Sequence, residues 1–262
     1  MIKIACGVSY VGTNFHGWQK QKEKLKTIAG ELTIAINKIA ATDNIELVCA
    51  GRTDAGVHAC EQVIHFECNK QRPLKAWVLG VNSLINSNIA INWSTEVNQK
   101  FNARFSATAR SYIYVIYNDH IFSPIFHNRV AMYPQKLNIK KMQQAAQYLL
   151  GEHDFSAFRA SGCQAKTAIR TILQINIWQY KQLIFTRITA NAFLYHMVRN
   201  IMGSLLLVGN GKQDVTWLKY ILQQRDRSQA GVTAKACGLY LHKVTYPQEF
   251  ILPQTKNTIF DI

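Results

Sequence analysis

One order of strands and helices, β-α-β-β-α-β, is predicted twice along this chain, and this repeat restricts the fold more than any other feature. Apolar residues alternate over residues 2–10, the period of a half-buried strand, and then recur at helical spacing from Ile28 to Ile39. The first half continues with strands at 45–50 and 62–68, a helix after Pro73 that runs through Leu84, and a strand at 89–97.

The second half repeats the series with one additional helix. The predicted elements are a strand at 111–117, a helix at 139–150, a hairpin of 172–178 and 183–190, helices at 193–208 and 215–224, and a closing strand at 239–246. Each half therefore has the order of a split βαβ unit.

These patterns predict an α+β protein of two ferredoxin-like (split βαβ, RRM-like) halves. We expect their antiparallel sheets to join into one larger sheet, with helices on one face. The expected divisions are residues 1–105, which carry the loop with Asp54, residues 106–246, and a C-terminal tail at 247–262.

The charge balance indicates a polyanionic partner. Thirty Lys and Arg residues oppose fifteen Asp and Glu residues, which gives a formal charge of +15 and a pI near 9.6. Nucleic acid or an anionic membrane surface would account for this excess, whereas the alternative is a basic protein that uses its charge for solubility.

The location expected from the sequence is the cytoplasm. No apolar stretch approaches the roughly 20 residues of a membrane-spanning helix, and the first residues do not resemble a secretory signal. The six cysteines are scattered and form no CxxC pair, so we expect reduced thiols. His58, Cys60 and Cys68 do not have the spacing of a common zinc site, and no metal is expected.

The segment Ala50-Gly-Arg-Thr-Asp-Ala-Gly-Val-His-Ala59 is the most unusual loop, because it sets one carboxylate, Asp54, two residues after Arg52. Loops fixed between two strands commonly carry catalytic residues, and an adjacent arginine would hold the carboxylate ionised. The alternative is a tight turn in which Asp54 caps backbone amides.

A second unusual feature is an arginine within an apolar helix. On the predicted helix, His196, Arg199, Asn200 and Gly203 form one narrow polar stripe with apolar flanks. A buried Arg199 would need an anion, and Asp54 and an RNA phosphate are the evident choices. The alternative is that Arg199 extends along the helix edge to solvent.

Two tyrosines, Tyr112 and Tyr114, lie two residues apart on one predicted strand and therefore share a face. Aromatic side chains on such a sheet can stack on RNA bases. Ordinary packing within the sheet is the alternative.

Several longer motifs carry a family resemblance. The segments GRTDAGVHA, FNARFSATARSYIYVIYN, NAFLYHMVRNIMGSLLLVG and TAKACGLYLHKVTY, in this order, resemble the TruA family of tRNA pseudouridine synthases, as do YVGTNFHGWQKQ and LLGEHDFSAFRA. The resemblance runs from Tyr10 to about Tyr246. The chain departs from the family pattern at Val11, where aspartate is usual, and at Ala29, where glutamine is common.

The resemblance implies an isomerase that detaches uracil from C1′ of ribose, turns it and rejoins it through C5. It implies that Asp54 is the nucleophile and that Arg52 displaces the target base. It also implies that Tyr112 stacks on uracil and Arg199 pairs with Asp54. The family acts without cofactor or metal, as a homodimer, on uridines 38, 39 and 40 of the tRNA anticodon arm.

The remaining substrate-binding residues are expected around these groups. His58 belongs to the motif itself. Basic residues expected to hold tRNA are Lys20, Lys22, Lys24, Lys26, Arg104, Arg110, Arg159, Lys166 and Arg170. Each could instead be a solvated surface charge.

Other functions fit the sequence less well. A non-catalytic RNA-binding module with two RRM-like halves would not need the whole Asp54 loop, and no RNP1-like pattern occurs. The H-x-E and P-C-x-x-C motifs of zinc deaminases are absent, and residues 209–213 do not form a nucleotide-binding P-loop. A small-molecule enzyme would leave the positive charge unexplained.

Overall fold

The computed structural model describes residues 1–21 and 25–255, which form two compact units. Unit 1 comprises Met1–Thr108 together with the chain from Tyr240 onward, and unit 2 comprises Ala109–Leu239. Unit 2 is therefore inserted in the sequence of unit 1.

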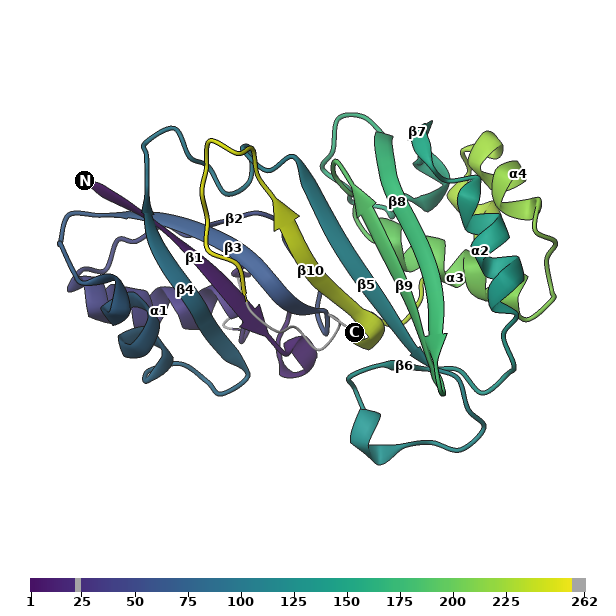
Figure 1. Ribbon diagram of the computed structural model, residues 1–262, viewed down its shortest axis with the longest axis horizontal. Helices are drawn as coiled ribbons and strands as arrows, with labels where there is room; N and C mark the ends of the chain where they lie inside the picture. The colour runs from purple at the N-terminus through teal and green to yellow at the C-terminus, as the bar shows by residue number, and fades with distance from the viewer. Residues whose placement is uncertain (22–24, 256–262) are drawn as a thin grey trace. The chain divides into compact units, whose positions relative to one another are not determined.

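Unit 1 contains a mixed sheet with the strand order β4-β1-β3-β10, in which the short strand β2 also pairs with β3. Figure 1 shows α1 against one side of this sheet. The elements are β1 (Ile2–Tyr10), α1 (Ile28–Ala40), β2 (Val48–Cys49), β3 (His58–Cys68), β4 (Ile89–Val97) and β10 (Leu239–Thr245), with a 3-10 turn at Gly12–Asn14 and a π-helical turn at Ala76–Gly80.

Strand β1 lies in the middle of this sheet and pairs antiparallel with both β3 and β4. It is buried along almost its whole length, with Ala5 and Cys6 both at 0% exposure. The alternation predicted a half-buried strand, but Ala5, Gly7 and Ser9 on the other face are small, and Lys3 is buried with its ammonium group bonded to Gln99 O and Phe101 O, so both faces can be covered.

Helix α1 forms where the apolar spacing predicts it. Thr27 precedes the helix, and its side chain accepts a hydrogen bond from the Gly30 N–H group. Leu32 and Ile36 are fully buried on the inner face. Ala41 ends the helix in the left-handed conformation, with φ of 52°.

The strands around the predicted catalytic loop differ from the expectation at both ends. The strand expected at 45–50 is reduced to Val48–Cys49, and β3 begins at His58 instead of residue 62. The early start of β3 is due to a partner that is distant in the sequence. Tyr240 and Leu241 of β10 pair in parallel with His58 and Ala59, so the closing strand, which the sequence placed in the second half, extends the start of β3.

Unit 2 contains the strand order β5-β9-β8-β7, with β6 paired to β5. Its helices gather on one side of this sheet (Figure 1). The elements are β5 (Ala109–Tyr117), β6 (Ala131–Met132), α2 (Ile139–Gln147), β7 (Gly151–Asp154), β8 (Ile169–Tyr180), β9 (Leu183–Ala190), α3 (Met197–Gly209) and α4 (Trp217–Gln224), with 3-10 turns at Pro124–Phe126, Ser156–Phe158, Arg227–Gln229 and Ala236–Gly238.

The predicted hairpin is confirmed as β8 and β9, which pair antiparallel. Helix α3 begins four residues later than predicted, because His196 adopts φ of 60° and cannot continue a right-handed helix backwards. The two short strands β6 and β7 were not predicted.

The α+β class is confirmed, with helices packed on sheets in both units. The joining of the two predicted sheets stays a prediction. None of the helices in the described part of the chain is long and apolar enough to cross a membrane.

Candidate active site

The loop between β2 and β3 carries Asp54, and its first residues are held by β3. The Ala50 N–H group donates to Val63 O at 2.8 Å. The buried Gln62 side chain then binds both polar groups of Gly51, accepting from its N–H group at 3.3 Å and donating to its carbonyl at 2.5 Å. The path of the loop is thus fixed before it reaches Arg52.

The centre of the loop is held from the other side by β1 and the segment after it. The Thr53 hydroxyl lies 2.8 Å from the Tyr10 hydroxyl, and Thr53 O accepts from the Trp18 N–H group at 3.0 Å. A turn follows, in which the Val57 N–H group donates to Asp54 O at 3.1 Å. The half-buried Asp54 therefore stands between an anchored residue and a closed turn.

Gly17 allows this close packing. Its φ is +82°, and a Cβ added there would lie 2.7 Å from Thr53 O. No other residue type fits both the conformation and the space without displacing the loop. Val11 and Ala29, the two residues that depart from the family pattern, form backbone hydrogen bonds near this loop. The Val11 N–H group donates to Asn88 O, and the Ala29 N–H group donates to Trp18 O.

His58, expected among the substrate-binding residues, is fully buried at 0% exposure. Its Nδ1 accepts a hydrogen bond from the Gly12 N–H group at 3.1 Å. Its ring stacks on Tyr240 with the centroids 4.6 Å apart. The observed contacts of His58 hold the end of the loop, and burial this complete does not leave its ring accessible to RNA in this structure.

Two arginines of unit 1 lie near the start of the loop. Burial raises the pKa of the Cys49 thiol to about 11, and the positive charges of Arg52 and Arg104 oppose this rise. Both arginines are exposed, and the Arg104 guanidinium lies 5.3 Å from the centroid of the exposed Phe105 ring. Their charges therefore act on the same small region as the loop.

The other expected basic residues of unit 1 divide into two groups. Lys20 and Lys26 are exposed, and Lys26 lies over the Phe15 ring at 5.3 Å. Lys22 and Lys24 lie outside the described residues.

In unit 2, Tyr112 lies on β5 and is 9% exposed. The ring of Phe193 meets it edge-on, with a centroid distance of 5.0 Å and an angle of 87°. Tyr114, two residues further along β5, is fully buried, and its hydroxyl donates to Lys235 O at 2.9 Å. Burial raises the pKa of Tyr114 well above its usual range.

Arg199 lies in the first turn of α3 and is half-buried. Its Nε donates to Ala234 O at 2.8 Å, and the Ala234 N–H group donates back to Arg199 O at 3.1 Å. Asp54 belongs to unit 1 and Arg199 to unit 2, so their pairing stays a prediction.

Three of the other predicted RNA-binding arginines bind the backbone of unit 2. Arg110 donates to Asn191 O, Arg159 donates to Cys163 O and Ala165 O, and Arg170 donates to Thr167 O and Ile169 O. These bonds order the loops before β8 and after β9. Lys166 is exposed.

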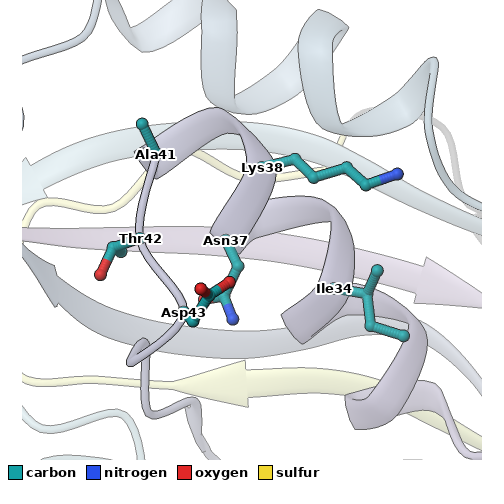
Figure 2. A pocket seen from close by; sticks show the side chains of 6 residues that line it. All are labelled: Ile34, Asn37, Lys38, Ala41, Thr42 and Asp43. Atoms are coloured by element: carbon teal, nitrogen blue, oxygen red, sulfur yellow. The ribbon is translucent and has the colours of Figure 1, made fainter.

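A shallow hollow at the end of α1 is a poor alternative site. Its lining residues are Ile34, Asn37, Lys38, Ala41, Thr42 and Asp43. Figure 2 shows Lys38 and Ile34 pointing away from Asn37 and Asp43, so the polar groups do not converge. Within the described residues, no three His, Cys, Asp or Glu side chains gather as metal ligands.

Sequence reasoning missed the residues that hold the site. Gln62 and Thr53 hold the loop in unit 1, and Asn200 connects α3 to a neighbouring segment in unit 2. Asn200 was noticed only as part of the polar stripe. The partners of Gln62 and Thr53 depend on tertiary contacts, for which no local pattern gives a signal.

Comparisons with known proteins agree with the motifs. A family model described as tRNA pseudouridine synthase matches residues 7–106 and 145–247. The chain is 48% identical over 253 residues to a tRNA pseudouridine synthase A of Vibrio campbellii, covering 97% of this chain and 95% of that protein. It is also 48% identical over 255 residues to a protein of the same name from Buchnera aphidicola subsp. Acyrthosiphon pisum, with the same two coverages.

A solved structure of a Cbf5-Nop10-Gar1 complex aligns with 78% of this chain, at 13% identity and a TM-score of 0.37. The alignment spans 45% of the chain in that complex. This likeness is too weak to support any further statement.

Proposed function

Because the chain belongs to the tRNA pseudouridine synthase family, it isomerises uridine to pseudouridine in tRNA, and we propose that Asp54 is the nucleophile. In this reaction the bond from N1 of uracil to C1′ breaks and a bond from C5 to C1′ forms. N1 gains a proton and C5 loses one. The reaction therefore needs a nucleophile and a base but no oxidant or reductant.

The observation that carries the assignment is the support of the Asp54 loop. Thr53 is tied to Tyr10 and Trp18, and Asp54 O is tied to Val57, yet the Asp54 side chain is only half-buried. A carboxylate fixed on a rigid loop is positioned before the substrate arrives, which lowers the entropic cost of reaching the transition state. An ionised carboxylate can then attack either C1′ of ribose or C6 of uracil.

Tyr112 is the proposed partner of the uracil ring. Its own ring is braced edge-on by Phe193, so it can present a fixed surface for stacking. Its hydroxyl is proposed to help remove the C5 proton after the base has turned.

Two arginines are proposed to serve the target nucleotide. The exposed Arg52 would occupy the space that the base leaves, which offsets the few kcal/mol of unstacking. Arg199 would pair with Asp54 through its terminal nitrogens, since its Nε already binds Ala234 O.

The finer substrate assignment is uridines 38, 39 and 40 of the anticodon arm, bound by a homodimer in the cytoplasm. The charge of +15 supports a surface that follows phosphates. Among the expected contacts, Lys20, Lys26 and Arg104 are exposed in the unit that carries Asp54. Affinity for tRNA should therefore fall steeply as salt rises.

The test compares pseudouridine formation in unmodified tRNA carrying uridine at position 39 by wild type, Asp54→Asn and the control Asp43→Asn. Asp43 is an exposed aspartate of the same unit that follows α1 and lies outside the loop. We expect Asp54→Asn to bind tRNA but form no pseudouridine, while Asp43→Asn behaves as wild type. Conversion by Asp54→Asn at the wild-type rate would remove Asp54 from the mechanism.

A further inference from the structure

Residues 230–238, here called the clasp, contact helix α3 and strand β5 of unit 2 at the same time. We propose that the clasp sets the position of the Arg199 guanidinium, and that Asn200, Arg227 and Thr233 are positioning residues of the isomerisation because they hold the clasp in place. This inference rests on the proposed role of Arg199.

The clasp touches Arg199 directly through a reciprocal pair of hydrogen bonds. Arg199 Nε donates to Ala234 O at 2.8 Å, and the Ala234 N–H group donates to Arg199 O at 3.1 Å. The side chain and the backbone of Arg199 are therefore both tied to Ala234. Any displacement of Ala234 is passed on to the guanidinium.

A polar triad around the buried Asn200 fixes the clasp one residue before Ala234, and its other two members, Arg227 and Thr233, are half-buried. The Thr233 hydroxyl donates to Asn200 Oδ1 at 2.6 Å, and Arg227 Nη2 donates to both Asn200 Oδ1 at 3.0 Å and Thr233 Oγ1 at 3.1 Å. Partial burial of the Arg227 guanidinium lowers its pKa below the usual value for arginine. Three side chains from three segments thus meet at one oxygen.

The orientation of Asn200 in this triad is unique. Asn200 is fully buried, and its Nδ2 donates to Phe158 O at 2.8 Å. A flipped amide would turn its donors toward the two donors at Oδ1 and leave Phe158 O unsatisfied. The triad therefore has one arrangement, which gives the clasp one position relative to α3.

Two glycines bring the backbone of the clasp against α3. The Gly231 N–H group donates to Ser204 Oγ at 2.9 Å, and Gly203 faces Val232 O so closely that a Cβ would collide with it. The helix and the clasp are in backbone contact here, so side-chain rearrangement cannot absorb a shift of the clasp.

The far end of the clasp is anchored to the strand of Tyr112. The Tyr114 hydroxyl donates to Lys235 O at 2.9 Å, and a Cβ on Gly238 would lie 2.8 Å from Tyr114 Cζ. The segment that holds Arg199 is therefore also bonded to the strand that carries Tyr112, two residues from it.

A polar triad suits positioning better than it suits stability. Well-packed apolar side chains would hold α3 as firmly as buried polar groups do, but they tolerate several arrangements. A satisfied hydrogen-bond network accepts one arrangement only. If the triad serves positioning, disrupting it should lower the rate of pseudouridine formation more than it lowers the stability of the protein.

The test is single-turnover pseudouridine formation by Thr233→Val, which keeps the shape of the side chain and removes its hydroxyl. We expect the rate at saturating enzyme to fall about 10- to 100-fold, since small misplacements of catalytic groups have effects of this order. Affinity for tRNA should stay within about twofold of wild type, because a group that acts only in the transition state changes the rate and leaves substrate binding unaffected. Thr233→Ser, which restores the hydroxyl, should recover the wild-type rate.

The matched control is Thr186→Val in β9. Thr186 is a fully buried threonine of unit 2, whereas Thr233 is half-buried, and the Thr186 hydroxyl has no hydrogen-bond partner among the described residues. This variant should keep the wild-type rate. Tyr114→Phe should slow the reaction as Thr233→Val does, because it removes the hydrogen bond to Lys235 O and releases the clasp there without touching the triad.

A double-mutant cycle separates positioning from a structural role. In an Arg199→Lys background, Thr233→Val should cause little additional loss of rate if the clasp acts through Arg199. An equal loss in both backgrounds would overturn the inference, as would a wild-type rate for both Thr233→Val and Tyr114→Phe. A wild-type rate for Arg199→Ala would instead overturn the proposed role of Arg199, on which the inference rests.

Discussion

The hydroxyl groups of Tyr10 and Thr53 lie 2.8 Å apart, so the last residue of β1 holds the loop one position before Asp54. Both side chains are buried, at 4% and 7% exposure. The bond connects the central strand of unit 1 to the proposed nucleophile through a single residue.

Replacing Tyr10 by phenylalanine should therefore destabilise the protein and slow catalysis. The buried Thr53 hydroxyl would lose this partner, which costs about 1–3 kcal/mol of unfolding free energy. The double variant Tyr10→Phe/Thr53→Val removes both polar groups and should regain most of that stability. Urea unfolding of wild type, the two single variants and the double variant checks this. The prediction is contradicted if the double variant loses as much stability as the two single variants together.

Alanine at Gly17 should disturb the loop more than a left-handed conformation alone explains. The conformation costs about 1–2 kcal/mol for a residue with a Cβ, and contact with Thr53 O adds to this at Gly17. Gly162 is the matched control, because its φ is +77° and nothing lies within 4 Å of the added Cβ. Melting temperatures should fall more for Gly17→Ala than for Gly162→Ala. Equal falls would contradict the prediction, because they would mean that the loop at Thr53 moves away from the added Cβ at little cost.

Gln143 should protect the open edge of β8. Its Oε1 accepts from the Ile177 N–H group at 2.6 Å, and its Nε2 donates to Ile175 O at 3.3 Å. Gln143→Ala should lose about 1–2 kcal/mol of unfolding free energy and expose backbone groups that recruit other strands. Light scattering and urea unfolding measure both effects. The adjacent exposed Gln144 provides the control, since Gln144→Ala should change neither.

Unit 1 should become less stable as pH falls from about 6.5 toward 4, because of His65. Burial chiefly, helped by the charge of Lys3 and opposed by that of Glu67, lowers the pKa of His65 to about 4. Its Nδ1 also accepts a hydrogen bond from the Ala103 N–H group at 3.1 Å. Between these pH values the unfolded state binds a proton that the folded state does not, so stability is complete above pH 6.5 and is lost as pH falls.

The measurement is the urea midpoint at pH 7.5, 6, 5 and 4 for wild type and His65→Asn. The variant has no imidazole, so its midpoint should fall less over this range. Parallel curves for the two proteins would mean that His65 titrates normally in the folded state.

The sequence predicts elements best where one periodicity is undisturbed, as in the hairpin of β8 and β9. It fails where a boundary depends on a distant partner or on one backbone angle. β3 starts at His58 because Tyr240 pairs with it, and α3 starts after His196 because of that residue's positive φ. The four residues of β7, a glycine and three polar residues, have no strand pattern and become a strand only by pairing with β8.

The same distinction applies to the site. A motif identifies Asp54, and the argument from an isolated charge singles out Arg199, because both signals are local. The motif also suggested His58 as a substrate contact, although its ring is enclosed beside Gly12 and Tyr240. Type and spacing of residues indicate which groups matter, but burial decides which of them can reach a substrate.

The pairing of β10 with the start of β3 has a consequence for the order in which the protein is made. All of unit 2 is translated between these two strands. A nascent chain that has completed β3 has the Asp54 loop but lacks Tyr240, whose ring lies against His58 at its end. The ribosome must therefore deliver the second unit before the first can finish folding, and a chain stalled before Leu239 carries the proposed nucleophile on an incomplete support.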